Sequence, residues 1–262
     1  DKGEKIFFIV LDNFRYDQWR VLANELSGLF NIEEQLYFSI LPTATQYARN
    51  AIFSGLMPDQ IAKLFPELWI DEDEEENKNL NEAPLIRTII ERYRRSDTFS
   101  YHKINDASGA ERLLAQLPAL AQNDLNVAVF NFIDMLSHSR TESKMIRELA
   151  STEAAYRSIT LSWFRHSPLS DLLKALASRQ YRVIITTDHG SIRVDNPIKV
   201  QSNSKEIIAN LRYKVSRNMG YNPILVIDIT QVGISLPILI ITTITSATTP
   251  IPSSMEAFRW KR

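Results

Sequence analysis

Three short, uninterrupted apolar segments constrain the fold of this chain more than any other feature. They are residues 6–11, 127–133 and 182–187, and each is rich in β-branched or aromatic side chains. Such runs are typical of strands that are buried on both faces. Segments with helical spacing lie between them, and strands that alternate with helices indicate a parallel sheet. We therefore predict an α/β fold with a mostly parallel central sheet and helices on both faces.

The other elements are predicted from periodicity and from residues that start or stop helices. Gly28 and Gly55 are expected to end two helices, because glycine is favoured just after a helix. The predicted helices cover residues 17–28, 45–54, 85–95, 109–122, 141–164 (one long helix or a pair) and 168–179. Further strands are predicted at residues 36–41, 98–102, about 224–229 and about 238–244.

Two segments differ in composition from the rest of the chain, which we otherwise treat as a single domain, 1–262. Residues 66–82 contain an acidic run, which predicts a solvated surface loop, with a mobile lid over a site as the alternative. The C-terminal segment 224–262 is atypical, because no charged residue lies between Asp228 and Glu256. Threonines and prolines interrupt its apolar residues, so we do not expect it to span a membrane.

Composition excludes several classes of protein. The net charge of −1 argues against a chain that binds nucleic acid over its whole surface. There is no cysteine, which excludes disulfides and thiolate metal sites, so any metal must be held by His, Asp, Glu or hydroxyl groups. The chain begins at Asp1 without a signal peptide or an initiator Met. We expect a cytoplasmic protein and a fragment of a longer chain.

Carboxylates and imidazoles follow the three strongest predicted strands. Asp12 follows the first, Asp134 and then His138 follow the second, and Asp188-His189 follow the third. Taken singly, each is an ordinary turn residue, helix cap or histidine. Ligands of open α/β sheets bind beyond the carboxyl ends of the strands, however, and two of the four histidines occur there. The combination predicts a site for zinc, manganese or iron.

Two threonines, Thr43 and Thr45, lie at the start of the predicted helix 45–54. The ordinary role of such a threonine is to cap the helix. A hydroxyl at a helix N-terminus also lies where backbone N–H groups attract an anion, and a neighbouring divalent metal makes its proton easier to lose. With metal ligands nearby, we favour a nucleophile for phosphorus.

Five segments, in this order, resemble the alkaline phosphatase superfamily. The similarity is greatest to PglZ domains, in particular the C-terminal effector domain of PorX-like two-component response regulators of type IX secretion. It extends over about residues 4–223. The segments are 11–19 (LDNFRYDQW), 41–55 (beginning LPTATQYARN), 134–138 (DMLSH), 187–191 (TDHGS) and 210–214 (NLRYK).

The resemblance implies two zinc ions that bridge a phosphate. In related phosphodiesterases the second threonine of a Pro-Thr-x-Thr segment is the nucleophile, which selects Thr45 over Thr43. The residues that match the ligands of the first ion are Asp12, Thr45, Asp188 and His189, and those that match the second are Asp134 and His138.

One departure affects the second zinc site. The family has a last histidine near the C-terminus, whereas this chain has none after His189. Ser254-Met255-Glu256 resembles the continuation after that histidine, which places Pro250 where the ligand belongs. Either the second site is incomplete, or residues 224–253 do not represent the natural sequence.

The resemblance implies a metal-dependent phosphodiesterase acting on phosphate esters, including short or cyclic oligonucleotides. Its predicted phosphate- or substrate-binding residues are Arg49, Asn50, Arg212 and Lys214, and the alternative for the basic residues is a solvated surface charge. One alternative function is a non-catalytic nucleotide- or partner-binding signalling module with a degenerate zinc site. Another is a phosphomonoesterase or phosphomutase. Signalling partners reached through N-terminal domains and a homodimer are further expectations.

Overall fold

The structure is a computed structural model, and it describes residues 4–70, 79–192, 208–209, 214–215 and 240–241. The chain divides into two compact units, Asp1–Ser191 and Ile192–Arg262. In the second unit, β5 (Ile208–Ala209), β6 (Lys214–Val215) and β7 (Ile240–Ile241) pair antiparallel. The predicted strand 238–244 contains β7, and the predicted strand 224–229 lies outside the described residues. The single-domain prediction for residues 1–262 stays a prediction.

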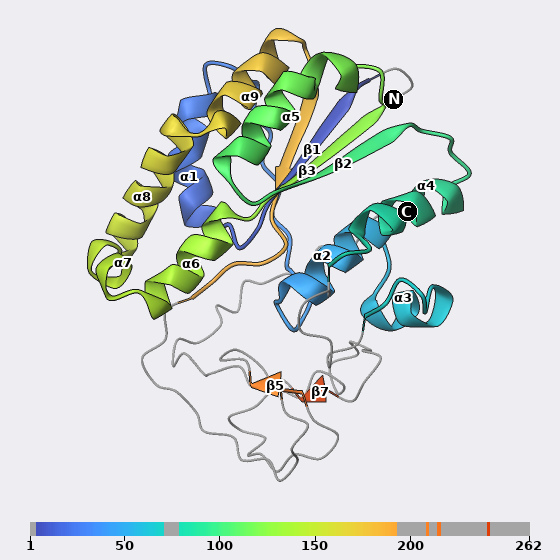
Figure 1. The fold of residues 1–262 in the computed structure, drawn as a ribbon, viewed down its shortest axis with the longest axis horizontal. Helices are drawn as coiled ribbons and strands as arrows, with labels where there is room; N and C mark the ends of the chain where they lie inside the picture. Colours follow the sequence, from blue (N-terminus) through green and yellow to red (C-terminus); the bar gives the residue numbers. More distant parts are fainter. Residues whose placement is uncertain (1–3, 71–78, 193–207, 210–213, 216–239, 242–262) are drawn as a thin grey trace. The chain divides into compact units, whose positions relative to one another are not determined.

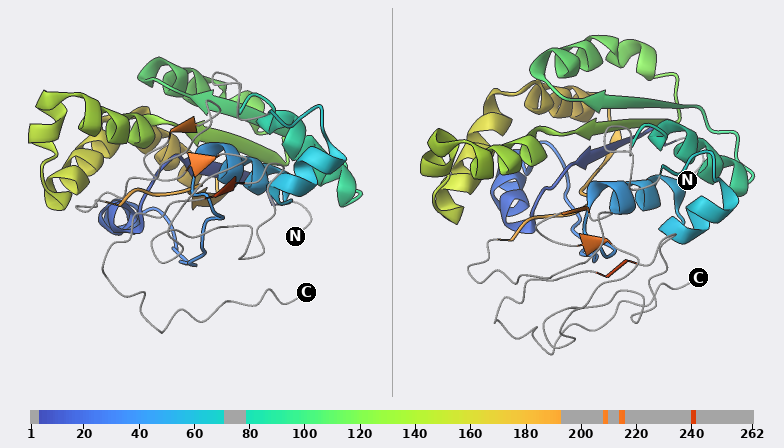
Figure 2. Two further views of the ribbon diagram at one scale, coloured as in Figure 1. Left: turned by 90° about the horizontal axis from the view of Figure 1, so that it is seen from below. Right: turned by 60° about the horizontal axis from the view of Figure 1, so that its bottom comes forward.

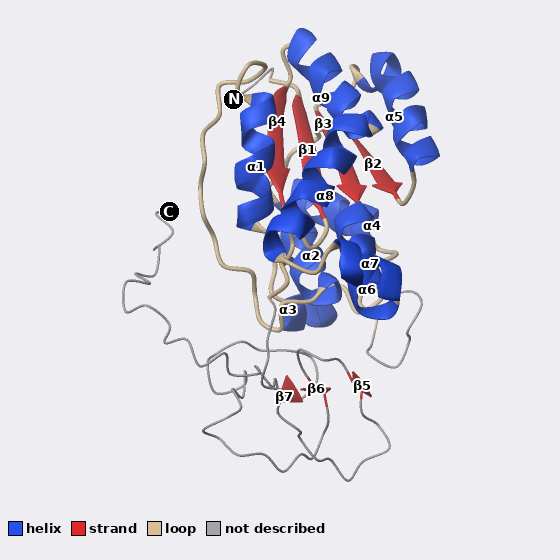
Figure 3. Cartoon of the chain, turned by 90° about the vertical axis from the view of Figure 1, so that its left-hand side faces the viewer, coloured by secondary structure: helices blue, strands red, loops and turns tan. Residues whose placement is uncertain are grey.

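The first unit is built on a parallel sheet. Its strands are β1 (Ile6–Leu11), β2 (Phe99–Ile104), β3 (Leu125–Phe130) and β4 (Arg182–Thr186), in the order β2-β3-β1-β4. All three pairings are parallel, and Figure 3 shows the four strands running in one direction. The carboxyl ends of the strands therefore lie at one edge of the sheet, as the sequence predicts.

Helices cover both faces of this sheet (Figure 1). Residues of α1, α5, α6, α8 and α9 pack on one face, and residues of α2, α3 and α4 pack on the other. The right-hand view of Figure 2 shows α5 (green) above β2 and β3, and α2 (blue) below them. The bounds are α1 Tyr16–Leu26, α2 Thr45–Ser54, α3 Pro58–Leu64, α4 Glu82–Arg92, α5 Ala107–Leu120, α6 Phe132–Glu142, α7 Lys144–Leu149, α8 Glu153–His166 and α9 Pro168–Ser178.

Alternate residues of β1 supply the two cores. Ile9 packs with the larger core on one face, and Val10 packs with the smaller core on the other. Successive strand side chains point to opposite faces, so a strand covered on both sides must be apolar throughout. This explains the continuous apolar run. Within the described part of the chain, no helix is long and apolar enough to cross a bilayer.

Several predicted boundaries are wrong. Residues 36–41 form no strand: Leu36 and Phe38 are exposed and lack the neighbouring strand and core that a buried strand needs. The predicted helix 141–164 is three helices, because Ser143 caps α7 and Thr152 caps α8. The acidic run lies outside the described residues, and the surface-loop prediction for 66–82 fails at Glu82, which is fully buried in the first turn of α4.

Replacing Gly55 by alanine is expected to lower the free energy of unfolding by about 1–2 kcal/mol. Gly55 ends α2 with φ 63, and an added Cβ would lie 2.8 Å from Ile89 Cδ1. Gly28, which follows α1, is the matched control, because a Cβ there would meet nothing within 4 Å. Urea unfolding should show a change of less than about 0.5 kcal/mol for Gly28→Ala. Equal losses at both positions would contradict the strain argument.

Candidate metal centre

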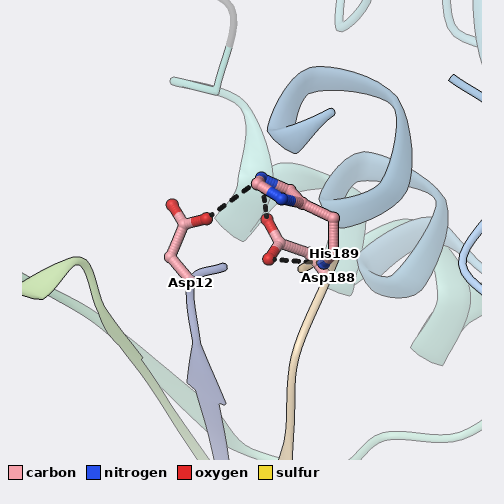
Figure 4. Close-up of side chains that lie close together, drawn as sticks. All are labelled: Asp12, Asp188 and His189. Atoms are coloured by element: carbon pink, nitrogen blue, oxygen red, sulfur yellow. Dashed lines mark hydrogen bonds and ion pairs between the residues drawn. The ribbon is translucent and has the colours of Figure 1, made fainter. Parts of the chain in front are cut away.

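Three predicted ligands meet at the carboxyl ends of β1 and β4 (Figure 4). Asp12 follows β1 directly, and Asp188 and His189 come just after β4. One possible ligand atom from each lies within 4.8 Å of the others. The three residues are 4%, 0% and 2% exposed, respectively. The sheet therefore brings together side chains that are far apart in the sequence.

Backbone hydrogen bonds fix this arrangement. The Asp12 N–H donates to Phe130 O at 3.0 Å, which extends the pairing of β1 with β3 by one residue. Asn13 then turns the chain with φ 58, a conformation that asparagine tolerates better than most residues. Its N–H donates to Asp188 Oδ1 at 3.2 Å, and the His189 N–H donates to the same oxygen at 2.9 Å. One oxygen of Asp188 is thereby held in place.

The other oxygen of Asp188 shows that a cation fits here. Asp188 Oδ2 is buried and accepts no hydrogen bond in the part of the chain that the structure describes, and its contact with His189 Nε2 is 3.9 Å long. A buried carboxylate oxygen without a partner is costly, because it has lost its hydration. Imidazole and carboxylate are ligands that zinc and similar divalent metals accept. These three residues can therefore hold a metal ion.

The local charge leads to the same conclusion. Among the described residues, Asp12, Asp188 and Glu82 are buried and interact with the guanidinium of Arg49, so their ionised forms bring three negative charges to one buried positive charge. Burial and then the neighbouring Asp188 raise the pKa of Asp12 to about 7. Burial also raises the pKa of Asp188. A divalent cation would supply the missing positive charge and keep both carboxyl groups ionised.

Without metal, the protein is expected to lose stability as the pH rises. Because the pKa of Asp12 is about 7 in the folded state, this carboxyl keeps a proton that the unfolded chain releases near pH 4. The stability it contributes is fully present below about pH 4 and is lost as the pH passes about 7. In chelator, the unfolding temperature should fall between pH 5 and pH 8, and saturating zinc should remove this fall. A rise in chelator would contradict the prediction.

Thr45 lies beside the cluster at the start of α2. Its Oγ1 is 3.0 Å from His189 Nε2 and 3.4 Å from Asp12 Oδ1. Ala44 occupies the N-cap position, so neither Thr43 nor Thr45 has the ordinary role of capping this helix. The hydroxyl of Thr45 contacts the candidate ligands instead.

Asp134 and His138 form a separate pair. The strand β3 ends at Phe130, three residues earlier than predicted, because the Asn131 carbonyl accepts the first hydrogen bond of α6 from Met135 N–H. Asp134 lies in the first turn of α6 and accepts a hydrogen bond from Asn13 Nδ2 at 3.0 Å. His138 Nε2 is 3.5 Å from Asp134 Oδ2, and its side chain is 67% exposed. A second metal site at this pair stays a prediction.

The predicted substrate-binding residues are found in different environments. Arg49 is only 1% exposed and pairs with Asp12 and Glu82, so the alternative of a solvated charge is wrong for it. Asn50 is also buried, and its Oδ1 accepts from Asn79 Nδ2 at 3.4 Å. Lys214 belongs to β6, and Arg212 lies outside the described residues.

Sequence reasoning missed two residues behind the cluster, Glu82 and Tyr101. Both reach the site through Arg49, and neither follows a predicted strand. It also assigned no role to Asn13, which links Asp134 to Asp188. The position of Asn13 directly after a strand-ending aspartate is a signal that could have identified it, since asparagine is favoured in turns.

The fold and this site define an α/β domain of the alkaline-phosphatase-like class. A family model described as the BREX system PglZ alkaline phosphatase-like domain matches residues 1–248, and the chain belongs to this family. The match supports a phosphoester hydrolase in general. No curated protein matches the chain.

Proposed function

We propose that this chain is a zinc-dependent phosphodiesterase with Thr45 as its nucleophile. The observation that carries the proposal is the position of the Thr45 hydroxyl, 3.0 Å from His189 Nε2 and 3.4 Å from Asp12 Oδ1. Family membership supports phosphoester chemistry at this site. The diester preference and the choice of zinc are our own inferences from the resemblance to PglZ effector domains.

The proposed ligands divide into two sets. Asp12, Thr45, Asp188 and His189 would hold one zinc ion, and Asp134 and His138 would supply two ligands to a second. Bound zinc lowers the pKa of a neighbouring hydroxyl and neutralises charge on the phosphate. The ten-residue helix α2 begins at Thr45, and its N-terminus favours an anion at that point.

In the proposed reaction, Thr45 Oγ1 loses its proton to solvent and forms a bond to phosphorus. The bond between phosphorus and one ester oxygen breaks in line with the attack, and the alcohol leaves with a proton from water. The intermediate is a threonine phosphodiester that still carries the second ester group. Water then attacks its phosphorus, the bond to Thr45 Oγ1 breaks, the threonine takes up a proton, and the phosphomonoester is released.

The first test is hydrolysis of bis(p-nitrophenyl) phosphate and of p-nitrophenyl phosphate by the zinc-loaded chain. We expect release of nitrophenol from the diester to be faster than from the monoester, and a chelator to stop both. Faster cleavage of the monoester would instead identify a phosphomonoesterase or phosphomutase.

A non-catalytic binding module is the second candidate. It is favoured by His138, whose side chain is 67% exposed, and by the absence of any histidine after His189 that could complete a second site. This function predicts that the zinc-loaded chain binds a dinucleotide, measured by calorimetry, without cleaving either ester. Binding that is unchanged in Thr45→Ala would support it further.

The cellular setting belongs to the same proposal and rests on the resemblance to PorX-like effector domains. It comprises a cytoplasmic response regulator, signalling through N-terminal domains, and a homodimer. Sedimentation equilibrium of the chain tests the last of these, because a sedimenting mass near 30.1 kDa at all concentrations would exclude the dimer for this chain.

A further inference from the structure

A chain of polar side chains, in which Arg49 and Glu82 are buried and Tyr101 is half-buried, lies behind Asp12. Tyr101 on β2 donates its hydroxyl proton to Glu82 Oε2, and Glu82 Oε1 accepts a hydrogen bond from Arg49 Nε. Arg49 Nη1 in turn donates to Asp12 Oδ2 at 2.7 Å. We call Tyr101, Glu82 and Arg49 the supporting triad. Its members come from β2, α4 and α2, so three elements converge on one carboxylate.

We propose that the supporting triad positions Asp12 for metal binding, by holding Oδ2 so that Oδ1 is the oxygen presented to the ion. This inference rests on the metal dependence in the proposed function. Tyr101, Glu82 and Arg49 are positioning residues, since each acts through Asp12.

The two oxygens of Asp12 have different surroundings. Oδ2 is paired with Arg49, whereas Oδ1 lies 3.4 Å from Thr45 Oγ1 and 3.5 Å from His189 Nε2. A half-turn of the carboxylate only exchanges two equivalent oxygens, whereas any intermediate angle breaks the ion pair with Arg49. The triad therefore fixes the plane of the carboxylate, with one oxygen on Arg49 and the other toward the candidate ligands.

Glu82 adds a charge argument. Arg49 alone would neutralise Asp12 and weaken its attraction for a cation. Glu82 is fully buried and pairs with the same guanidinium, so the charge of Arg49 is shared between two carboxylates. Asp12 thereby keeps negative charge for a metal while Arg49 still fixes its orientation.

A contribution to folding stability does not by itself explain why the supporting triad is polar and charged. It lies beside an apolar core that includes Val10, Phe53 and Leu85. Buried ion pairs are weak contributors to stability, and apolar side chains of similar volume are often as good or better. Orienting a metal ligand gives the triad a reason to be charged. Mutating the hydrogen-bond partners of metal ligands typically lowers metal affinity 10–100-fold.

The test compares Arg49→Lys and Tyr101→Phe with the parent chain. Lysine keeps the charge but cannot bridge Asp12 and Glu82 in the same way, and phenylalanine removes only the hydroxyl that holds Glu82. Zinc affinity is measured by competition with a chromophoric chelator, and thermal unfolding is measured without metal. We expect zinc affinity to fall about 10–100-fold in Arg49→Lys and by a smaller factor, about 10-fold, in Tyr101→Phe.

Thr160→Val is the matched control. It removes another fully buried hydrogen bond, from Gln18 Nε2 to Thr160 Oγ1 at 2.7 Å, on the opposite face of the sheet. It should lower the unfolding temperature and leave zinc affinity unchanged. If Arg49→Lys does not fold, Tyr101→Phe decides the question, because it changes no charge.

The outcomes separate this inference from the proposed function. Unchanged zinc affinity in a folded Arg49→Lys or Tyr101→Phe overturns the positioning role, even if the parent cleaves the diester. Reduced affinity in the variants supports it, even if the parent cleaves no ester and the phosphodiesterase proposal fails. A parent chain that binds no zinc overturns both.

Discussion

Thr45→Ala is expected to lower the rate of diester hydrolysis by roughly 10³-fold or more, because it removes the proposed nucleophile. Thr45→Ser keeps a hydroxyl at the same position and should retain most of the activity. The measurement is steady-state hydrolysis of bis(p-nitrophenyl) phosphate at saturating zinc. Zinc affinity is measured in parallel, since Thr45 is also a proposed ligand.

Thr43→Ala is the control for the Thr45 variants. Thr43 lies two residues earlier in the same segment, and Thr45 is the threonine whose hydroxyl is 3.0 Å from His189 Nε2. We expect Thr43→Ala to keep the parent rate within a few-fold. A larger loss at Thr43 than at Thr45 would show that the nucleophile has been assigned to the wrong threonine.

Asp188→Asn should have opposite effects on metal binding and on the stability of the metal-free chain. Asparagine keeps an oxygen for the N–H groups of Asn13 and His189, but it removes the charge and puts an NH2 group in the place of Oδ2. Zinc affinity should fall by about 100-fold or more, since mutating only the hydrogen-bond partners of metal ligands already lowers metal affinity 10–100-fold. The metal-free chain should gain stability above about pH 7, because the buried negative charge that raises the pKa of Asp12 is removed.

Both effects can be followed by thermal unfolding with and without zinc. The zinc-induced rise in unfolding temperature should be large for the parent and nearly absent for Asp188→Asn. Asp171→Asn is the control, because Asp171 is exposed and pairs only with Lys174 in the described structure. A metal-free Asp188→Asn that is less stable than the parent would contradict the charge argument.

The sequence was sufficient for the parts of the fold that repeat a local pattern. A strand buried on both faces must be apolar throughout, so β1 and β4 were predicted within one residue of their observed ends. The segment 36–41 has a similar composition but forms no strand. Its Tyr37 hydroxyl contacts the backbone oxygen of Thr187, and Ser39 Oγ donates to Asp188 O at 2.5 Å. Local sequence cannot show whether a neighbouring strand is available.

Of the candidate site, the sequence predicts the residues that follow strands but not the contacts between helices. Asp12 directly follows β1, Asp188 and His189 come just after β4, and parallel pairing alone brings such residues to one edge. The environment of Arg49 depends instead on how α2 packs against α4, which brings Glu82 to its guanidinium. That contact joins residues 33 positions apart and leaves no periodic signal in the sequence.

The place of β4 in the sheet determines when the site can exist during synthesis. Asn13 and Asp188 are hydrogen bonded although 175 residues separate them, and β4 is the last strand of this sheet to leave the ribosome. Until then β1 can pair with β3 but has one open, strongly apolar edge, which is a site for wrong pairing with other chains. A metal ion at the candidate site would therefore stabilise the finished unit, but it would not protect β1 in the nascent chain.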